Sequence, residues 1–229
     1  MDFLGSDALF SFLNKNGENS KLCLLIRHGE RRHITPADKD FGAHVTLTEK
    51  GRAEAFNLGV SAYEHLGSRY FEQMNFYSSP VERCVETALK IGDGILGCKN
   101  EAGQVDVQKL NCLGDYFVCN RGEYEKSLHE GFYPALCQYA AEGVHPAFYP
   151  LASRAEEMRQ MILEKSTAYF NVFVSHDAWI VPMLSHFCGL SFTPKRWMNF
   201  LTGILFEKKL SGKEKIYAIT GMDSGWLNF

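Results

Sequence analysis

The chain has 229 residues, a formal net charge of −3, 45% hydrophobic residues and 22% charged residues. These values are ordinary for a soluble globular protein, and the length suits one substantial domain rather than two. We therefore expect a single domain over residues 1–229. A net charge of −3 does not attract nucleic acid or an acidic membrane to the protein as a whole. An anion site would therefore need a local cluster of basic side chains.

The N-terminal segment and the cysteines favour a cytoplasmic protein. Residues 1–7 lack a positively charged stretch followed by an apolar core, so no signal peptide is predicted. No run approaches about 18 apolar residues, so we predict no membrane span. The seven cysteines are odd in number, scattered and free of any C-x-x-C pair, which favours reduced thiols over a disulfide framework or a zinc site.

The first predicted element is a strand over residues 21–26, a continuous apolar run that stops at a charged cluster. Such a run is typical of a strand that is buried on both faces of a parallel sheet. A helix is predicted next, because Thr46 stands three residues before Glu49 in the capping-box pattern and apolar residues follow at helical spacing. A shorter strand is predicted over residues 75–78.

The same helix-start pattern recurs twice. Ser79 and Ser153 each stand three residues before a glutamate, and we expect Pro80 at the first helical position, where its missing N–H costs nothing. Between these two helices, residues 110–150 are rich in Gly, Tyr, Phe and Cys and break the alternation of strands and helices. We interpret them as a small insertion that shapes or covers a site.

A second buried strand is predicted over residues 171–175, and shorter strands over residues 203–206 and 215–220. The aromatic tail, residues 221–229, is expected to fold back across a helix. Strands that alternate with helices predict an α/β domain of three layers, with helices on both faces of a mostly parallel central sheet.

Polar clusters follow several of these strands. In an open α/β sheet, ligands bind beyond the carboxyl ends of the strands, and three clusters fall at such places. They are Arg27, His28 and Arg31; Arg83; and His176 with Asp177. Guanidinium groups match phosphate oxygens bidentately and keep their charge. An imidazole among them could attack phosphorus, and a carboxylic acid could protonate the leaving oxygen.

Each cluster also has a structural explanation when it is taken alone. An Arg-His pair after a strand is more often a solvated edge, and Arg83 could pair with a glutamate on its own helix. His176 and Asp177 could form a turn. The position of all three clusters after separate strands favours a shared anion site.

Four segments carry a resemblance to a known family. Residues 27–30 look like an R-H-G signature, residues 47–53 resemble L-T-x-x-G-x-x-A, residues 78–88 are similar to S-S-P-x-x-R-x-x-x-T-A, and residues 175–177 match a final histidine segment. Together, in this order over residues 22–182, they resemble the histidine phosphatase superfamily, which includes the phosphoglycerate mutases and the histidine acid phosphatases.

The resemblance implies a phosphoglycerate mutase-like fold and a role for each matching residue. His28 would be the nucleophile that becomes phosphorylated, while Arg27, Arg83 and His176 would hold the phosphoryl group. Arg31 fits the R-H-G-x-R extension of the acid-phosphatase branch and would bind phosphate as well. Since phosphoryl transfer depends mainly on positioning and charge neutralisation, no metal and no other cofactor is implied.

The identity of the proton donor depends on the branch. One branch takes it from a glutamate after the second arginine, and the acid-phosphatase branch takes it from an aspartate directly after the last histidine. Asp177 fits the second pattern and is favoured as the general acid. Asp115, Glu123 and Glu125 in the insertion remain alternatives. His33 stands where the acid-phosphatase branch usually has proline, and the chain is far shorter than typical acid phosphatases.

The predicted function is therefore that of a metal-independent phosphatase acting on a small phosphorylated metabolite. Alternatives of the same fold are a protein phosphohistidine or phosphotyrosine phosphatase and a phosphomutase. A non-catalytic phosphate-binding module is a further alternative, against which the intact set of candidate residues argues. Neither a C-x5-R loop nor a G-x-S-x-G elbow nor a P-loop is present in the sequence. The aromatic tail would suit a homodimer contact.

Overall fold

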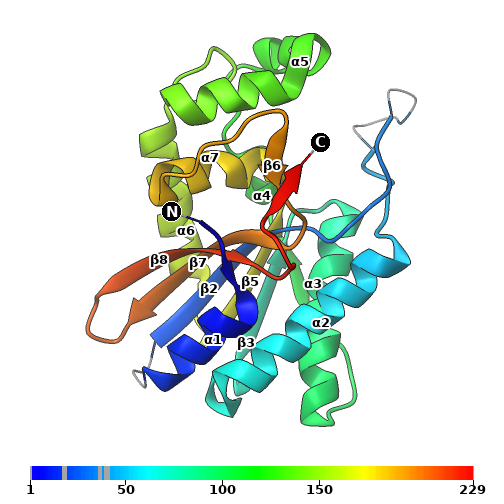
Figure 1. The fold of residues 1–229 in the computed structure, drawn as a ribbon, viewed down its shortest axis with the longest axis vertical. Helices are drawn as coiled ribbons and strands as arrows, with labels where there is room; N and C mark the ends of the chain where they lie inside the picture. Colours follow the sequence, from blue (N-terminus) through cyan, green and yellow to red (C-terminus); the bar gives the residue numbers. More distant parts are fainter. Residues whose placement is uncertain (1, 17–19, 36–37, 39–41, 229) are drawn as a thin grey trace.

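A seven-stranded sheet in the order β1-β8-β7-β2-β5-β3-β4 forms the centre of the computed structural model, which describes residues 2–16, 20–35, 38 and 42–228 (Figure 1). Its strands are β1 (Leu4–Gly5), β2 (Ser20–Arg27), β3 (Met74–Ser78), β4 (Val107–Lys109), β5 (Phe170–Ser175), β7 (Thr202–Lys209) and β8 (Glu214–Thr220). Strand β7 is antiparallel to both of its neighbours, β2 and β8, and the other pairs are parallel. The five predicted strands and the mostly parallel sheet are confirmed.

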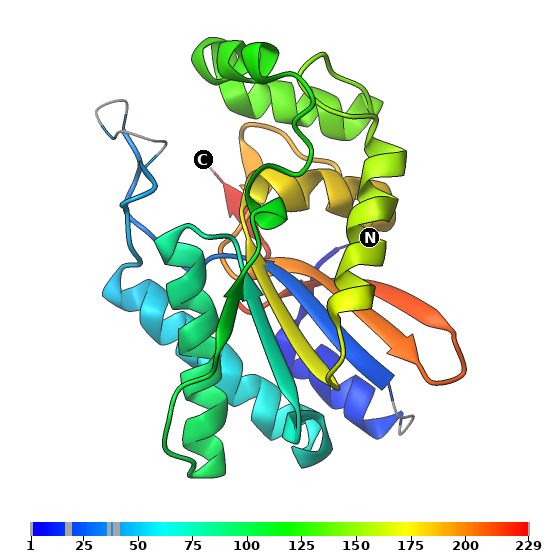
Figure 2. The same ribbon diagram turned by 180° about the vertical axis from the view of Figure 1, so that it is seen from behind.

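Helices lie on both faces of this sheet (Figures 1 and 2). They are α1 (Ser6–Lys15), α2 (Glu49–Leu66), α3 (Glu82–Lys99), α4 (Cys112–Asp115), α5 (Arg121–Glu142), α6 (Leu151–Lys165) and α7 (Asp177–Cys188), with a short 3-10 helix, η2 (Ser68–Phe71). Successive side chains of β2 point to opposite faces. Leu24 packs in one core with Leu58 of α2, and Leu25 packs in another core with Ile180 of α7. The predicted three-layer α/β/α architecture is thus confirmed.

Helices α2 and α3 cross at glycines. A Cβ atom on Gly59 of α2 would lie 2.1 Å from the backbone oxygen of Ile91, and one on Gly94 of α3 would lie 2.2 Å from the backbone oxygen of Phe56. No side chain fits at these distances, so the two backbones approach each other directly. This close crossing fixes the position of α3, whose first turn carries Arg83.

The three predicted helices exist, but their starts differ from the capping-box prediction. Helix α2 follows Thr48, whose hydroxyl accepts a hydrogen bond of 3.0 Å from the Gly51 N–H, so Thr48 rather than Thr46 is the N-cap. Pro80 lies before α3 rather than at its first position, and Ser153 lies inside α6. The packing of each turn decides which residue begins the helix, and the sequence pattern alone does not resolve this.

Residues 110–150 contain α4 and α5, and α5 lies beyond the carboxyl ends of the strands (Figures 1 and 2). Helix α5 is broken at Gly131, where φ is 138° and ψ is 82°, a backbone conformation that favours glycine. It packs on α7, since Tyr124 and Trp179 place their ring centroids 6.1 Å apart and the Ser185 hydroxyl donates to the Ala140 carbonyl over 2.7 Å.

The prediction that the C-terminal tail crosses a helix is wrong. Strand β9 (Trp226–Asn228) instead pairs antiparallel with β6 (Arg196–Met198) in a separate two-stranded sheet, and the Arg196 guanidinium lies 3.5 Å from the centre of the Trp226 ring. Phe229, the last residue of the predicted tail, lies outside the described residues.

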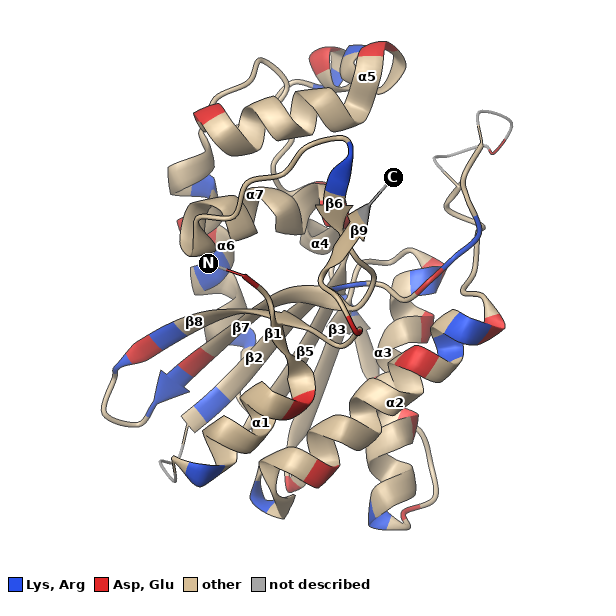
Figure 3. Ribbon diagram, viewed as in Figure 1, with Lys and Arg blue, Asp and Glu red and all other residues tan. Residues whose placement is uncertain are grey.

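Charged side chains mark the outer helices and the free end of the β7–β8 hairpin (Figure 3). Among the described residues, none of the helices has the length and apolar character needed to cross a membrane.

Candidate active site

The site lies where three parallel strands end side by side. Arg27 at the end of β2 pairs with Ser175 at the end of β5, and Ser78 at the end of β3 pairs with Val174 of β5. Because these strands run parallel, the residues that follow them emerge at one edge of the sheet. The polar clusters that the sequence placed after separate strands therefore meet there.

His28 is buried, and its hydrogen bonds determine where its proton lies. Nδ1 is 2.8 Å from the Gly29 carbonyl oxygen, which can only accept, so Nδ1 carries the hydrogen. Nε2 then keeps a lone pair, and it accepts a hydrogen bond of 3.1 Å from Arg83 Nε. The Gly29 N–H in turn donates to the Thr87 hydroxyl over 3.0 Å. This network holds the imidazole in the tautomer that a nucleophilic Nε2 requires.

His176 faces His28 across the site, with ring centroids 5.6 Å apart. Its Nδ1 lies 3.5 Å from Arg83 Nη2, which can only donate, and its Nε2 lies 3.0 Å from the Ser79 hydroxyl. The proton of His176 therefore lies on Nε2. Arg83 thus contacts both histidines, and its Nη1 donates to the Gly42 carbonyl over 2.8 Å.

Arg27 and Asp177 form a buried ion pair of 2.9 Å between Nη2 and Oδ2. A neighbouring segment fixes both partners: the Trp197 indole N–H donates to Asp177 Oδ2 over 2.9 Å, and Arg27 Nη1 donates to the Met198 carbonyl over 2.7 Å. The Phe200 ring covers the guanidinium of Arg27 at 4.2 Å. The carboxylate therefore touches a predicted phosphate-binding group directly.

Arg31 lies at the same edge of the sheet and adds positive charge. Its Nη1 donates to the Arg32 carbonyl over 2.8 Å, while its buried Nε has no partner among the described residues. Burial and the charge of Arg27 lower the pKa of Arg31, although a guanidinium remains cationic near neutral pH. Its Nε is thus a donor without an acceptor in the part of the chain that the structure describes.

Electrostatics leave the site positively charged. Burial and the nearby arginines lower the pKa of His28 well below its usual value, and the same causes lower the pKa of His176 to about 3, so both rings are neutral. Burial would raise the pKa of Asp177, but the charge of Arg27 and the hydrogen bond from Trp197 hold it below its usual value. Three guanidinium groups thus face one carboxylate, which favours an anionic ligand.

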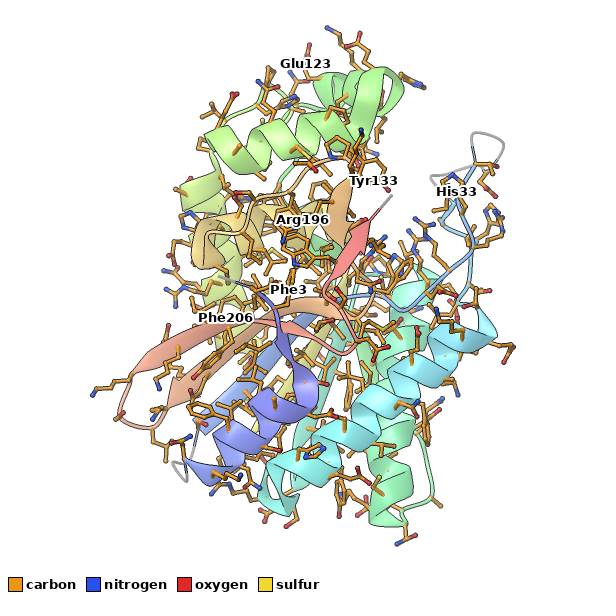
Figure 4. All side chains as sticks on the ribbon, in the orientation of Figure 1. Phe3, His33, Glu123, Tyr133, Arg196 and Phe206 are labelled. Carbon is orange, nitrogen blue, oxygen red and sulfur yellow. The ribbon has the colours of Figure 1, made fainter. Side chains whose placement is uncertain are left out.

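The alternative proton donors are exposed or turned away from this cluster. The Asp115 side chain is 62% exposed, and Glu125 is 59% exposed and lies 3.5 Å from Arg121. Glu123 lies on the side of α5 that is turned away from the strand ends (Figure 4). In the part of the chain that the structure describes, Asp177 is the carboxylate in contact with Arg27.

Several residues that support the site were not predicted from the sequence. Ser79 and Thr87 lie within the segment that resembles S-S-P-x-x-R-x-x-x-T-A, so the motif contained their signal. Trp197 and Tyr133 had no local signal, since an isolated aromatic residue is more often part of a core. Tyr133 extends from α5 towards β6, where its ring meets that of Trp197 edge-on at 4.9 Å (Figure 4).

Within the described ranges, no group of three or more His, Cys, Asp or Glu side chains is arranged to hold a metal ion.

Comparison with known proteins adds a family and a fold. The sequence profile of the histidine phosphatase superfamily (branch 1) matches residues 23–205. The matching profile is that of branch 1, whereas the positions of Asp177 and Arg31 resemble the pattern of the acid-phosphatase branch. A search of curated proteins gives no significant match.

Several solved structures share the fold at low sequence identity. YhfR of Bacillus stearothermophilus is 18% identical with a TM-score of 0.52, and the match covers 90% of this chain and 98% of that protein. Phosphoserine phosphatase of Entamoeba histolytica in complex with 3-phosphoglyceric acid is 16% identical with a TM-score of 0.51, covering 89% and 98%. A mycobacterial glucosyl-3-phosphoglycerate phosphatase is 16% identical with a TM-score of 0.50, covering 88% and 99%.

Proposed function

Since the chain belongs to the histidine phosphatase superfamily, which supports a phosphatase or phosphomutase activity, we propose that it hydrolyses phosphomonoesters through a phosphohistidine on His28. The observation that carries this proposal is the fixed tautomer of His28. Its Nδ1–H is bound to the Gly29 carbonyl, and its Nε2 lone pair faces Arg83 beside His176.

In the first step, Nε2 of His28 attacks phosphorus, an N–P bond forms, and the bond between phosphorus and the ester oxygen breaks. Arg27, Arg31 and Arg83 neutralise the charge that spreads over the equatorial oxygens, and His176 lies beside them. These guanidinium groups supply the positive charge that a metal ion would otherwise provide, which supports a metal-independent reaction.

Asp177 is the proposed general acid, and the substrate can supply its proton. The carboxyl is ionised in the free protein because Arg27 and Trp197 stabilise its charge. A bound phosphate dianion competes for the Arg27 guanidinium and repels the carboxylate, and both effects raise the pKa of Asp177. A phosphomonoester loses its second proton near about pH 6, so a monoanionic ester can transfer that proton to Asp177.

The proton then passes from Asp177 to the leaving oxygen, and the carboxylate that remains can accept a proton from water. In the second step water attacks phosphorus, the N–P bond breaks, and inorganic phosphate and a free His28 are regenerated. The kcat/KM should therefore fall as the free ester loses its second proton above about pH 6. The alkaline limb of kcat reports instead the proton that the bound ester and Asp177 share.

We propose a small phosphorylated metabolite as the substrate class and the cytoplasm as the location. The printed names of two structural neighbours, a phosphoserine phosphatase and a glucosyl-3-phosphoglycerate phosphatase, support the substrate class by analogy alone. The seven free cysteines support a reducing compartment.

The test compares the wild type with His28→Ala on an aryl phosphate in the presence of a chelator. We expect turnover by the wild type and none by His28→Ala. Equal turnover by both proteins would reject His28 as the nucleophile, and loss of wild-type turnover in chelator would reject metal independence. A phosphoryl group on His28 should be lost when the protein is treated with acid, because the phosphorus–nitrogen bond of phosphohistidine is labile in acid.

A second experiment tests the proton donor. Asp177→Asn should slow hydrolysis of an alkyl phosphate by about 100-fold, in the range of general acid catalysis, and affect an aryl phosphate with a good leaving group far less. An equal loss on both substrates would move the proton donor to Asp115, Glu123 or Glu125, each of which can be replaced in turn.

A further inference from the structure

One short strand binds both members of the Arg27–Asp177 pair. Within β6, Trp197 donates its indole N–H to Asp177 Oδ2 over 2.9 Å, and the next residue, Met198, accepts from Arg27 Nη1 over 2.7 Å. Trp197 is 1% exposed, so its N–H has no access to water as an alternative partner. The orientation of the ion pair is thus set by a strand outside the seven-stranded sheet.

We propose that Trp197 is a positioning residue, whose indole N–H occupies one lone pair of Asp177 Oδ2 and directs the catalytic proton to the other. The inference rests on the proposed function, in which Asp177 protonates the leaving oxygen.

The acceptor positions of the Asp177 carboxylate explain why the direction of the catalytic proton matters. An ionised carboxylate has about four acceptor positions on its two oxygens. Oδ1 accepts from the Ala178 N–H over 3.0 Å, and Oδ2 accepts from both Trp197 and Arg27. When a phosphoryl group competes for Arg27, the position on Oδ2 that faced the guanidinium becomes free. A proton placed there points towards the anion that now binds Arg27.

Packing holds the indole in place. The Trp197 ring meets Tyr133 of α5 at 4.9 Å and 87°, and it meets Phe192 at 6.0 Å. Trp197 also pairs with Leu227 of β9. Because α5 and β9 both contact it, the helix over the strand ends and the C-terminal strand contribute to the position of the acid.

Several other groups act on the same carboxylate. Arg27 and Arg31 precede α2, Arg83 belongs to α3, His176 precedes Asp177, and the phenols of Tyr124 and Tyr133 approach from α5. The arginines favour the ionised form of Asp177, His176 does so only when it is protonated, and the phenols oppose it when they are ionised. A change confined to Trp197 leaves all of these groups in place.

Trp197→Phe is the variant that tests the proposal, because it keeps an aromatic ring and removes the N–H. Trp226→Phe is the matched control, since the Trp226 indole N–H binds Asp2 at the surface of the adjacent strand. Hydrogen bonds to charged groups are worth about 1.5–3 kcal/mol, which corresponds to about 10- to 100-fold in rate or about one to two pH units.

We expect Trp197→Phe to lower kcat for an alkyl phosphate by about 10- to 100-fold and to move the alkaline limb of the kcat profile up by about one to two pH units. An aryl phosphate with a good leaving group should lose far less, and Trp226→Phe should match the wild type on both. Equal losses on both substrates with an unmoved alkaline limb would mean that Trp197 acts only through packing, and the proposal would be rejected.

A measurement on the wild type covers the case in which Trp197→Phe fails to fold. In tryptophan-labelled protein saturated with inorganic phosphate, the indole N–H resonance of Trp197 should titrate with Asp177. The resonance of Trp226 should instead follow Asp2, whose pKa lies below its usual value, and that of Trp179 should follow neither carboxylate. Assignment uses Trp179→Phe and Trp226→Phe. An indole resonance of Trp197 that ignores pH would overturn the inference, whereas an inactive wild type or an active His28→Ala would instead reject the proposed function.

Discussion

Acidification from about pH 7.5 to about pH 5 should destabilise the protein through the histidines of the site. Burial and the adjacent arginines lower the pKa of His176 to about 3 and lower that of His28 in the same direction. In the unfolded chain each imidazole returns to a pKa of about 6.5. The unfolded state therefore binds more protons in this window, so stability is fully present above about pH 6.5 and is lost as the pH falls towards the folded pKa.

The magnitude for His176 follows from the unfolded pKa. At about pH 5 the assay is about 1.5 units below that pKa, and each unit is worth about 1.36 kcal/mol, so His176 alone should reduce the free energy of unfolding by about 2 kcal/mol. This figure requires only that the folded pKa lies below the assay pH. His28 adds a further loss of the same sign.

Urea denaturation of the wild type and His176→Asn at both pH values, in phosphate-free buffer, measures this contribution. Asn keeps a donor for the Ser79 hydroxyl but cannot be protonated, so the variant should lose about 2 kcal/mol less than the wild type on acidification. His129→Asn, at an exposed position of α5, is the control and should follow the wild type. If His176→Asn and the wild type lose the same free energy, His176 is not a buried neutral base and the electrostatic account of the site is wrong.

Three further predictions concern stability and can be checked by urea denaturation. Asp177→Asn should reduce the free energy of unfolding by about 3 kcal/mol because it leaves a buried guanidinium without its counterion, and excess inorganic phosphate should stabilise this variant more than the wild type. Gly94→Ala should cost about 2 kcal/mol, since its Cβ would lie 2.2 Å from a backbone oxygen of α2. Gly97→Ala, whose Cβ meets its nearest neighbour at 3.8 Å, should instead stabilise by about 0.5–1 kcal/mol, and a loss there would contradict the packing argument. Thr87→Val should cost about 1–3 kcal/mol and lower turnover, because the buried N–H after His28 loses its acceptor, whereas Thr87→Ser should retain both.

Much of the fold could be predicted from local sequence patterns. The apolar runs at residues 21–26 and 171–175 are confirmed as the adjacent strands β2 and β5. When both faces of a sheet are buried, the side chains on each face of a strand are apolar, so a continuous apolar run indicates a buried strand. The helices between them were also predicted, although their first residues were not, since neighbouring hydroxyls compete to cap a helix and packing selects one.

The approximate position of the site could be predicted for a related reason. Residues that follow parallel strands emerge at one edge, so His28 and His176 were expected to be neighbours before any distance was known. Their ring centroids lie 5.6 Å apart. The roles of these histidines stay predictions until the kinetic tests are made.

The amino-acid sequence by itself determined the strands, the layers and the edge at which the charged residues gather. Only the tertiary structure decided that Nδ1 of His28 is bound by the Gly29 carbonyl, that Asp177 is paired with Arg27, and that Trp197 holds that pair. Local patterns report whether each segment is buried and which way it runs. The contact between Arg27 and Met198 joins positions 171 residues apart, and such a contact depends on how all the segments between them pack.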